Sequence, residues 1–258
     1  MLLNQIKGIQ VIDEDDNHVL VTVGGGENWH NLVLWSISHN LSGLQNLSLI
    51  PGSVGAAPIQ NIGAYGVEQS SCFHSLRAIS LTSGLTKLYY REDCKYIITH
   101  VSYMLSKEVN INVSYGAIRN ELNNRKIETP TLKQISNVIC DIRVSKLPDP
   151  LVVGNAGSFF KNPIVTIEAY ESLLQKYPEI VAFPFGDQMK LSAGWLIDRA
   201  GWKGHSQNGA GVYKNHALVL INDGTNSGGD IWQLAMDIQA DVLTKYGVEV
   251  APEVNVWG

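Results

Sequence analysis

The sequence predicts an α+β protein built in two parts, and three observations support this fold class. The first half of the chain is dominated by strand patterns, in which apolar and polar residues alternate. The second half alternates helical patterns with a short buried strand, and Pro148-Asp149-Pro150 breaks the chain between the halves. The 258 residues correspond to one large domain or two modest ones at about 150 residues each. We therefore expect domains at 1–147 and 148–258.

Strand and helix signals can be placed in order along the first half. Residues 9–13 and 18–23 alternate and predict a strand pair across a polar turn, and residues 27–40 predict a helix with Glu27 in its first turn. Further strands are predicted at 76–81, 85–90, 97–105 and 109–115. Residues 129–144 predict a helix with Pro130 at its first position.

The second half carries clear helix boundaries. Thr166 is the expected cap of a helix to residue 177, and Gly201 is expected to end a helix at 190–200. A buried strand is predicted at 217–221. Ser227 and Asp230 resemble a capping box that opens a helix to residue 246, with Gly247 just past its end.

Composition excludes several classes of protein. Hydrophobic residues make up 45% of the chain and charged residues 17%, which excludes a disordered, solvating chain. The net charge of −5 provides no attraction to nucleic acid or to an anionic membrane. Cys72, Cys94 and Cys140 form no Cys-x-x-Cys pair, so neither a disulfide scaffold nor a zinc site is expected. The chain start lacks a signal-peptide pattern and no apolar run reaches about 20 residues, so we expect a cytoplasmic protein.

Residues 50–66 form an uncharged segment that fits neither helix nor strand spacing. Its glycines would allow backbone amides to approach a phosphate or a cofactor. The segment matches neither the Walker nor the Rossmann fingerprint, so taken alone an ordinary irregular loop is favoured.

Two other segments could carry chemistry. Ser158 stands among small residues with Phe159 and Phe160 behind it, which indicates either a hydroxyl held at a site or a turn packed by the two rings. No Gly-x-Ser-x-Gly elbow is present, which disfavours a hydrolase. Glu253 lies in an apolar run near the end of the chain. It is either a carboxylate at a strand edge facing water, which is favoured, or a buried carboxylate with a purpose.

Single residues elsewhere have plainer interpretations. His30 on its helix is expected to be a surface or packing residue, and Lys146 a solvated charge. Tyr65 and Tyr115, each next to a glycine, are either loop-packing residues or ligand contacts.

Taken together and in this order, these segments resemble the UDP-N-acetylenolpyruvoylglucosamine reductases of peptidoglycan synthesis. The resemblance runs nearly from end to end. The motifs that carry it are Gly24-Gly25-Gly26-Glu27-Asn28-Trp29-His30, the segment 50–66, Lys146-Leu147-Pro148-Asp149-Pro150, the segment 154–163, Ala193-Gly194-Trp195-Leu196-Ile197-Asp198, Ala217-Leu218-Val219-Leu220-Ile221-Asn222 and Pro252-Glu253-Val254.

The resemblance implies a fold, a reaction and its reactants. The fold is a vanillyl-alcohol-oxidase-type FAD-binding domain, incomplete here, followed by a smaller α/β substrate-binding domain whose tail returns to the active site. The reaction is the reduction of UDP-N-acetylglucosamine enolpyruvate to UDP-N-acetylmuramate, with FAD as cofactor and NADPH as hydride donor. The partner is a small-molecule UDP-sugar, not nucleic acid or membrane, and a monomer is the default.

The resemblance also assigns roles to residues. Ser158 is the proton donor to C2 of the substrate, and Glu253 polarises the enolpyruvyl group. The expected flavin contacts are Gly52, Val54, Gly55, Ala57, Pro58, Ile59, Asn61, Ile62, Gly63, Ala64 and Gly66. The expected UDP-sugar contacts are Tyr65, Tyr115, Lys146 and Asn162.

The chain departs from the family pattern in two places. The match begins after the family's Gly-x-Gly-Ser-Asn-type pyrophosphate loop, and the family's Tyr-Arg-Asp-Ser run is absent after residues 92–96. Tyr90-Arg91-Glu92 is interpreted as a strand end and not as a substitute. Two other functions therefore stay open. One is a catalytically impaired remnant that binds only the UDP-sugar, and the other is a different FAD-linked oxidase, which the segment 154–163 disfavours.

Overall fold

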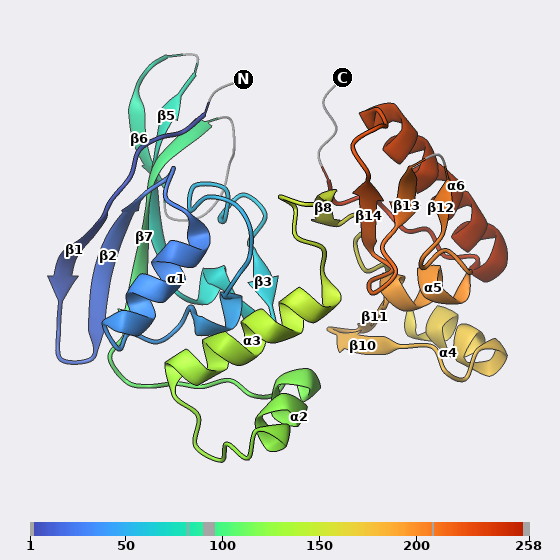
Figure 1. Ribbon diagram of the computed structural model, residues 1–258, viewed down its shortest axis with the longest axis horizontal. Coiled ribbons are helices and arrows are strands. Elements are labelled where there is room, and N and C mark those ends of the chain that lie inside the picture. The colour runs from blue at the N-terminus through green and yellow to red at the C-terminus, as the bar shows by residue number, and fades with distance from the viewer. Residues whose placement is uncertain (1–2, 82, 90–95, 208, 255–258) are drawn as a thin grey trace. The chain divides into compact units, whose positions relative to one another are not determined.

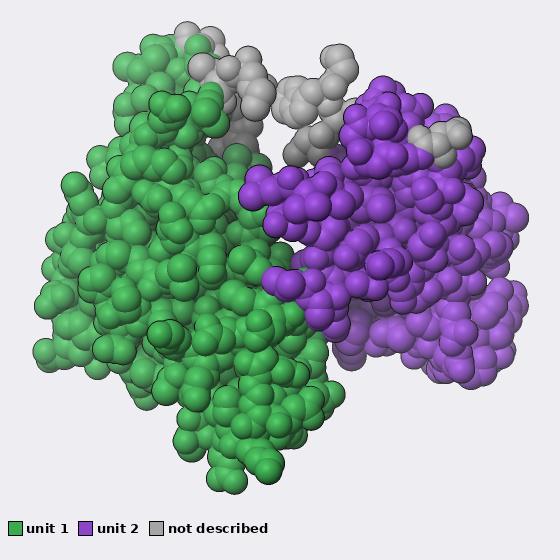
Figure 2. Space-filling view, in the orientation of Figure 1, with its two compact units in different colours: residues 1–143 green, residues 144–258 purple. Residues whose placement is uncertain are grey.

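A computed structural model describes residues 3–81, 83–89, 96–207 and 209–254 (Figure 1). The chain divides into two compact units, Met1–Arg143 and Val144–Gly258, which Figure 2 shows in different colours and which are described separately below. Helix α3 (Leu132–Lys146) runs across this division. The domain boundary expected from the sequence, at Pro148, lies shortly after it.

Unit 1 is built on an antiparallel sheet with the strand order β1-β2-β7-β5-β6. Its strands are β1 (Ile9–Glu14), β2 (His18–Gly24), β5 (Phe73–Ser80), β6 (Thr86–Tyr89) and β7 (Tyr96–Ser106). One face of the central strands is fully buried and largely apolar, since Val21 pairs with Tyr103 and Val23 with Val101, all without exposed surface. The predicted strand pair and the strands predicted at 76–81 and 97–105 are confirmed, and the strand predicted at 85–90 is confirmed as far as Tyr89, the last residue described there.

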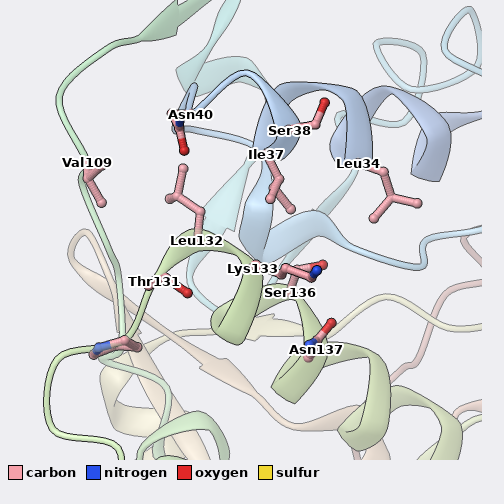
Figure 3. Close-up of a pocket in the computed structure, with 11 residues that line it drawn as sticks. Leu34, Ile37, Ser38, Asn40, Val109, Thr131, Leu132, Lys133, Ser136 and Asn137 are labelled. Carbon is pink, nitrogen blue, oxygen red and sulfur yellow. The ribbon is translucent and has the colours of Figure 1, made fainter.

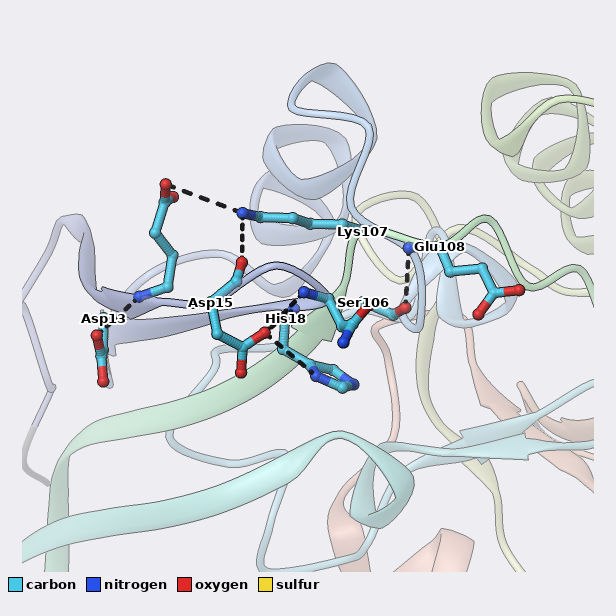
Figure 4. A network of polar contacts seen from close by, with 8 residues as sticks. Asp13, Asp15, His18, Ser106, Lys107 and Glu108 are labelled. Carbon is cyan, nitrogen blue, oxygen red and sulfur yellow. Dashed lines mark hydrogen bonds and ion pairs between the residues drawn. The ribbon is translucent and has the colours of Figure 1, made fainter.

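The turn between β1 and β2 is held by a network of polar contacts (Figure 4). The Asp15 carboxylate accepts hydrogen bonds from the backbone N–H groups of Asn17 and His18, each at 2.7 Å, which lowers the pKa of Asp15. Lys107, just after β7, donates to the Asp15 carbonyl at 2.6 Å and lies 3.9 Å from the Glu14 carboxylate. These exposed contacts fasten the hairpin to β7.

Helix α1 (Trp29–Ser38) packs on the apolar face of the sheet (Figure 1). Its cap is Asn28, whose side chain accepts from the N–H of Asn31 at 3.1 Å. The expectation that Glu27 lies in the first helical turn is therefore wrong, because the helix begins two residues later. Glu27 instead accepts from the backbone N–H of Gly8 and of Asn28. The buried Trp29 donates from its indole nitrogen to the Leu47 carbonyl at 2.9 Å.

Helix α3 was predicted, but with a different start. Thr131 and Gln134 cap it reciprocally: the Thr131 hydroxyl accepts from the Gln134 N–H, and the Gln134 side chain accepts from the Thr131 N–H. Pro130 thus precedes the cap and is not the first helical residue. The short helix α2 (Gly116–Asn124), which was not predicted, packs Ile118 and Leu122 into a separate small core with α3.

The strand predicted at 109–115 is wrong. No backbone partner pairs with this segment as a strand in the described part of the chain. Its alternate carbonyls are instead occupied by side chains from residues 42–46. Nearby lie the short elements η1 (Gln45–Leu47), β3 (Gly63–Ala64), β4 (Val67–Glu68) and η2 (Gln69–Ser71).

The described residues of unit 2 form two small sheets and three helices. The sheets have the strand orders β12-β13-β14-β8 and β10-β11-β9. Their strands are β8 (Gly154–Ser158), β9 (Ile164–Val165), β10 (Ala182–Phe185), β11 (Gln188–Leu191), β12 (Ser206–Gln207), β13 (Ala210–Val212) and β14 (Val219–Asn222). The helices are α4 (Ile167–Lys176), α5 (Ala193–Arg199) and α6 (Gly228–Tyr246).

Most predicted boundaries of unit 2 are confirmed. Thr166 caps α4, Ser227 and Asp230 form the capping box of α6, and Gly247 ends α6 in the left-handed conformation with φ 67°. The helix predicted at 190–200 is wrong at its start, because Lys190 and Leu191 belong to β11. Ser192 then caps α5 by accepting from the Trp195 N–H at 3.2 Å.

Within the described residues, no helix combines the length and the apolar character needed to cross a membrane.

The run Gly24-Gly25-Gly26 has no room for side chains. A Cβ atom on Gly25 would collide with the Ile98 carbonyl oxygen and with the Asn4 side chain, and one on Gly26 with the Asn4 carbonyl. The same backbone donates from Gly25 to the Thr99 carbonyl at 2.7 Å. Glycine is needed here because neighbouring backbone lies on both sides of the run.

We predict that Gly25→Ala lowers the free energy of unfolding by about 1–3 kcal/mol or more, because a rigid backbone must shift to accept the methyl group. Gly228→Ala is the matched control, since a Cβ atom there meets nothing within 4 Å and the residue begins α6. Urea denaturation of both variants measures the difference. Equal stabilities for Gly25→Ala and the unaltered protein would contradict the close approach.

Candidate functional site

The glycine-rich loop 50–66 is anchored in unit 1 by buried residues and backbone hydrogen bonds. Val54 and Ala57 are buried in the core of the unit. The Val54 N–H donates to the Glu27 carbonyl at 2.9 Å, and the Gly55 N–H donates to the Gly25 carbonyl at 2.8 Å. The loop is therefore fixed against the end of β2 and the start of α1.

The other residues of the loop that were predicted to contact flavin reach the surface. Gly52, Ile59, Asn61, Gly63 and Gly66 are exposed, whereas Pro58, Ile62 and Ala64 are half-buried. Three residues of the loop are buried and fix it to the rest of unit 1: Val54, Gly55 and Ala57. The remaining predicted flavin contacts present backbone and side-chain surface to solvent. The Asn61 side chain is already used, since it donates to Glu68 at 2.7 Å and accepts from the Ser70 N–H.

Unusual backbone conformations gather in and just before this loop. Leu49, Asn61 and Tyr65 have φ of 58°, 41° and 53°, in the left-handed region that non-glycine residues rarely adopt. Gly52 and Gly66 also have positive φ. Backbone strain of this kind is concentrated at ligand-binding sites, where the surrounding contacts hold it in place.

The structure brings Tyr65 and Tyr115 together. Their rings meet edge to face with centroids 5.2 Å apart and an interplanar angle of 87°. Tyr115 is the residue before α2 and its side chain is 46% exposed. Burial raises the pKa of Tyr65, so its phenol is a neutral hydrogen-bonding group at physiological pH.

Arg143 is a candidate that sequence reasoning missed. It hydrogen-bonds the Tyr65 side chain, and its Nε donates to the Leu49 carbonyl at 3.2 Å. The N–H of the strained Leu49 donates in turn to Nδ1 of His30 at 3.0 Å. Burial lowers the pKa of Arg143, yet a guanidinium stays charged in proteins, so a partly desolvated cation lies beside the loop. The available signal was its position on α3 one turn before Lys146 of the quoted motif.

In unit 2, Ser158 and Glu253 lie on neighbouring backbone segments. Ser158 ends β8, opposite Val219 of β14. The chain at 251–253 runs antiparallel to 159–161: the Glu253 N–H donates to the Phe159 carbonyl at 2.8 Å, and Lys161 donates to Ala251 at 2.9 Å. Glu253 is thus opposite the residue that follows Ser158, and both side chains are exposed. Of the two alternatives for Glu253, the structure has the strand-edge carboxylate that faces water.

The other two predicted substrate contacts, Lys146 and Asn162, differ in whether the side chain already has a hydrogen-bond partner within the protein. Lys146 is the exposed last residue of α3. Asn162 accepts from the backbone N–H of Ala193 at 3.0 Å, so its side chain already supports the start of α5.

An aromatic and cationic face in unit 2 was not predicted. Phe183 of β10 pairs with Lys190 of β11, which pairs with Ile164 of β9, so the three side chains share one face of this sheet. Phe183 is 55% exposed and Phe185 46%, and the Lys190 ammonium lies 4.2 Å from the Phe185 ring centroid. The alternation of Phe183 and Phe185 across Pro184 was a strand signal that could have found it.

One other feature of unit 1, a pocket, contains none of the predicted site residues. An open pocket lies between α1 and the start of α3, bordered by Leu34, Ile37, Leu132 and neighbouring polar side chains (Figure 3). Among the residues that the structure describes, no three His, Cys, Asp or Glu side chains are grouped to hold a metal ion.

Comparisons with known proteins match both units. A family model described as the FAD binding domain matches residues 1–87, and one described as the C-terminal domain of UDP-N-acetylenolpyruvoylglucosamine reductase matches residues 149–257. The crystal structure of UDP-N-acetylenolpyruvylglucosamine reductase from Thermus caldophilus is similar in fold, with a TM-score of 0.61 and 22% identity over 92% of this chain and 72% of that chain. The predicted fold class is thereby confirmed.

Curated relatives are more similar in sequence. The UDP-N-acetylenolpyruvoylglucosamine reductase of Pseudomonas syringae pv. tomato is 44% identical over 97% of this chain and 78% of its own length. That of Burkholderia lata is 44% identical over 98% of this chain and 78% of its own length. The resemblance inferred from the motifs is confirmed, and the chain belongs to the UDP-N-acetylenolpyruvoylglucosamine reductase family.

Proposed function

We propose that this protein is a FAD-dependent reductase that converts UDP-N-acetylglucosamine enolpyruvate into UDP-N-acetylmuramate for peptidoglycan synthesis, with NADPH as the hydride donor. The observation that carries the proposal is the 44% identity to reductases of this name over nearly the whole chain. The presence of both family models in order supports it. A cytoplasmic location is part of the proposal.

The residues of unit 1 fit a flavin. The loop 50–66 is uncharged and fixed in place, and a Cβ atom on Gly52 would meet nothing within 4 Å, so its backbone is open to a ligand. We assign the exposed and half-buried residues of the loop to direct contact and Val54, Gly55 and Ala57 to its support. When bound, FAD would accept a hydride from NADPH and deliver it to C3 of the enolpyruvyl group.

We assign Arg143 to stabilising the negative charge of the substrate. Hydride addition leaves negative charge on the substrate, whose carboxylate is also anionic. A guanidinium held by Tyr65 and by the Leu49 carbonyl stabilises such charge more strongly than a mobile surface lysine, because it is partly desolvated and fixed. The fixed geometry depends on His30, whose unprotonated Nδ1 accepts from Leu49.

Ser158 and Glu253 supply the proton chemistry in unit 2. After hydride reaches C3, C2 carries the electron pair, and the Ser158 hydroxyl donates its proton there. A hydroxyl is a weak acid, but a carbanion is a strong base, so transfer requires mainly that the hydroxyl be held in place. Ser158 is held by the pairing of β8 with β14, and Glu253 by the backbone bond to Phe159. We assign Glu253 to polarising the enolpyruvyl group.

The aromatic face of unit 2 suits a nucleotide. An exposed phenylalanine offers a flat apolar surface to a base, and a lysine beside it offers charge to a diphosphate. We assign Phe183 and Lys190 to the UDP portion of the substrate, with Lys146 as a second cation in this unit.

The alternative is a remnant that binds the UDP-sugar without turnover. The absence of the Tyr-Arg-Asp-Ser run from the sequence favours it. The strand end expected at Tyr90-Arg91-Glu92 lies outside the described residues. Substrate binding without NADPH consumption would support the remnant and contradict the reductase.

For Ser158→Ala in protein reconstituted with FAD, we predict that NADPH still bleaches the flavin at the wild-type rate. Reoxidation by the UDP-sugar should slow by about 100-fold or more, because the proton donor is gone. Stopped-flow absorbance separates the two half-reactions. Wild-type reoxidation in the variant would rule out Ser158 as the donor.

For Phe183→Ala, we predict a KM for the UDP-sugar raised by about tenfold with little change in kcat, because stacking on a base contributes about 1–3 kcal/mol. Ile167→Ala is the control, since this residue of α4 is also exposed, at 45%. Steady-state kinetics measure both. The same KM for both variants and the unaltered enzyme would contradict the nucleotide assignment.

Stability should fall in mild acid. Burial, and then the charge of Arg143, lower the pKa of His30 below its ordinary 6.5, and burial likewise lowers the pKa of His100. The unfolded chain therefore binds more protons. This contribution is complete above pH 6.5 and is lost as pH falls through the folded-state pKa values.

His30→Asn should reduce the loss of stability between pH 7 and pH 5, and His100 should account for part of what remains. Thermal unfolding midpoints across this range measure the slope. An unchanged slope in His30→Asn would contradict a lowered pKa of His30 in the folded protein.

A further inference from the structure

Residues 108–115, here called the clamped segment, belong to no strand and are held by side chains. Ser42 Oγ donates to the Glu108 carbonyl at 2.7 Å, and Gln45 Nε2 donates to the Asn110 carbonyl at 2.8 Å. Asn46 Nδ2 donates to the Asn112 carbonyl at 2.9 Å. The three acceptors are alternate residues of the segment.

The last of these contacts differs from the first two, since it also reaches the glycine-rich loop. Asn46 Nδ2 lies 3.3 Å from the Tyr65 carbonyl, which it also contacts as a donor. Asn112 Nδ2 donates to the Gly66 carbonyl at 3.2 Å. Two asparagines therefore tie the peptide groups of Tyr65 and Gly66 to the clamped segment.

The same asparagine also directs the chain toward Tyr115. Asn112 Oδ1 accepts from the Ser114 N–H at 2.9 Å and from the Ser114 hydroxyl at 2.6 Å. This turn sets the chain immediately before Tyr115, the cap position of α2. Asn112 thus acts on both tyrosines: on Tyr65 through the Gly66 carbonyl and on Tyr115 through Ser114.

The environment of Asn46 shows that this arrangement has an energetic cost. Asn46 has no exposed surface, and its Oδ1 finds no hydrogen-bond partner among the described residues. A buried polar atom without a partner is destabilising. Tyr65 itself has a left-handed φ of 53°, which needs surrounding contacts to persist. Folding alone gives no reason for this combination, whereas placement of a functional side chain does.

We propose that Asn46 and Asn112 are positioning residues of the UDP-sugar site, which hold Tyr65 in its strained conformation and set its ring against Tyr115. This proposal rests on the proposed function, in which Tyr65 and Tyr115 contact the substrate. The two asparagines touch neither substrate nor flavin and act only through the tyrosines.

Asn112→Asp tests the proposal with a change of one group. The carboxylate keeps both bonds from Ser114 but cannot donate to the Gly66 carbonyl. Because Asn112 is half-buried, the variant should fold. The control is Gln45→Glu, which keeps the bond accepted from the Gly43 N–H at 2.8 Å and loses the donation to the Asn110 carbonyl. Because Gln45 is buried, circular dichroism first establishes that this variant is folded, and the uncharged Gln45→Met, which also cannot donate, takes its place if it is not.

In the FAD-loaded enzyme, we expect Asn112→Asp to raise the KM for the UDP-sugar by about tenfold, the equivalent of one lost hydrogen bond, with kcat within about twofold. Gln45→Glu should lower the unfolding temperature and leave KM unchanged. An unchanged KM in Asn112→Asp, or an equal rise in Gln45→Glu, would overturn the positioning role.

Hydrogen exchange tests the same proposal without turnover. Amides of residues 62–67 should exchange at least about tenfold faster in Asn112→Asp and at the unaltered rate in Gln45→Glu. Equal exchange in both variants would overturn the proposal. If the unaltered holoenzyme neither binds nor reduces the UDP-sugar while exchange responds as expected, then the proposed function fails and the clamp on Tyr65 stands.

Discussion

The candidate site of unit 1 depends on one constraint: backbone must pass against backbone at Gly24-Gly25-Gly26. The N–H of Gly25 bonds to β7 through Thr99, and its carbonyl accepts from Gly55 of the glycine-rich loop. One residue thus joins the sheet to the loop, and a side chain there would push them apart. The positions of Val54 and Ala57 in the core, and the surface that the rest of the loop presents, follow from this contact. The constraint also explains why the loop can be uncharged and still ordered.

Polar side chains hold the clamped segment in place of the hydrogen bonds that a neighbouring strand would make. The clamped segment contains residues with strand-like alternation, yet Ser42, Gln45 and Asn46 occupy its carbonyls. These side chains bring the chain to Tyr115 at a fixed point beside Tyr65. Unit 2 uses ordinary backbone pairing for the same purpose, since β8 and the chain at 251–253 place Ser158 and Glu253 on adjacent segments. The two units therefore differ in how they can be tested. A substitution can remove one side-chain hydrogen bond of the clamped segment, whereas it leaves the backbone hydrogen bonds of β8 in place.

Much of this fold was predictable where local chemistry decides it. The caps at Thr166 and at Ser227 with Asp230 follow from short-range hydrogen bonds, and the apolar face of α6 at Leu234, Ala235, Ile238 and Val242 follows from helical periodicity. Predictions failed where distant residues decide. The segment 109–115 was expected to be a strand because its partners, at residues 42–46, leave no trace in its own pattern. The start of α1 is a different case, since a local contact decides it: Asn28 caps the helix and leaves Glu27 outside.

The site was predictable only in part for the same reason. The loop 50–66 and the pair Ser158 and Glu253 were proposed as site residues from their motifs, whereas Arg143 and the face with Phe183 and Lys190 were not. The role of Arg143 arises from contacts with Leu49 and Tyr65, far away in the chain. Phe183 and Lys190 meet only through the pairing of β10 with β11. Contacts of this kind, between residues that are separated along the chain, cannot be predicted from residue type and spacing alone.

The most direct test of the central claim, that the fixed and uncharged loop binds flavin, is the visible absorption spectrum of the 258-residue protein after incubation with FAD and desalting. The account predicts a yellow protein that retains flavin in roughly equimolar amount, because the loop is already ordered and little entropy is lost on binding. A colourless protein would contradict it, since the loop would then be a packed turn and not a cofactor site.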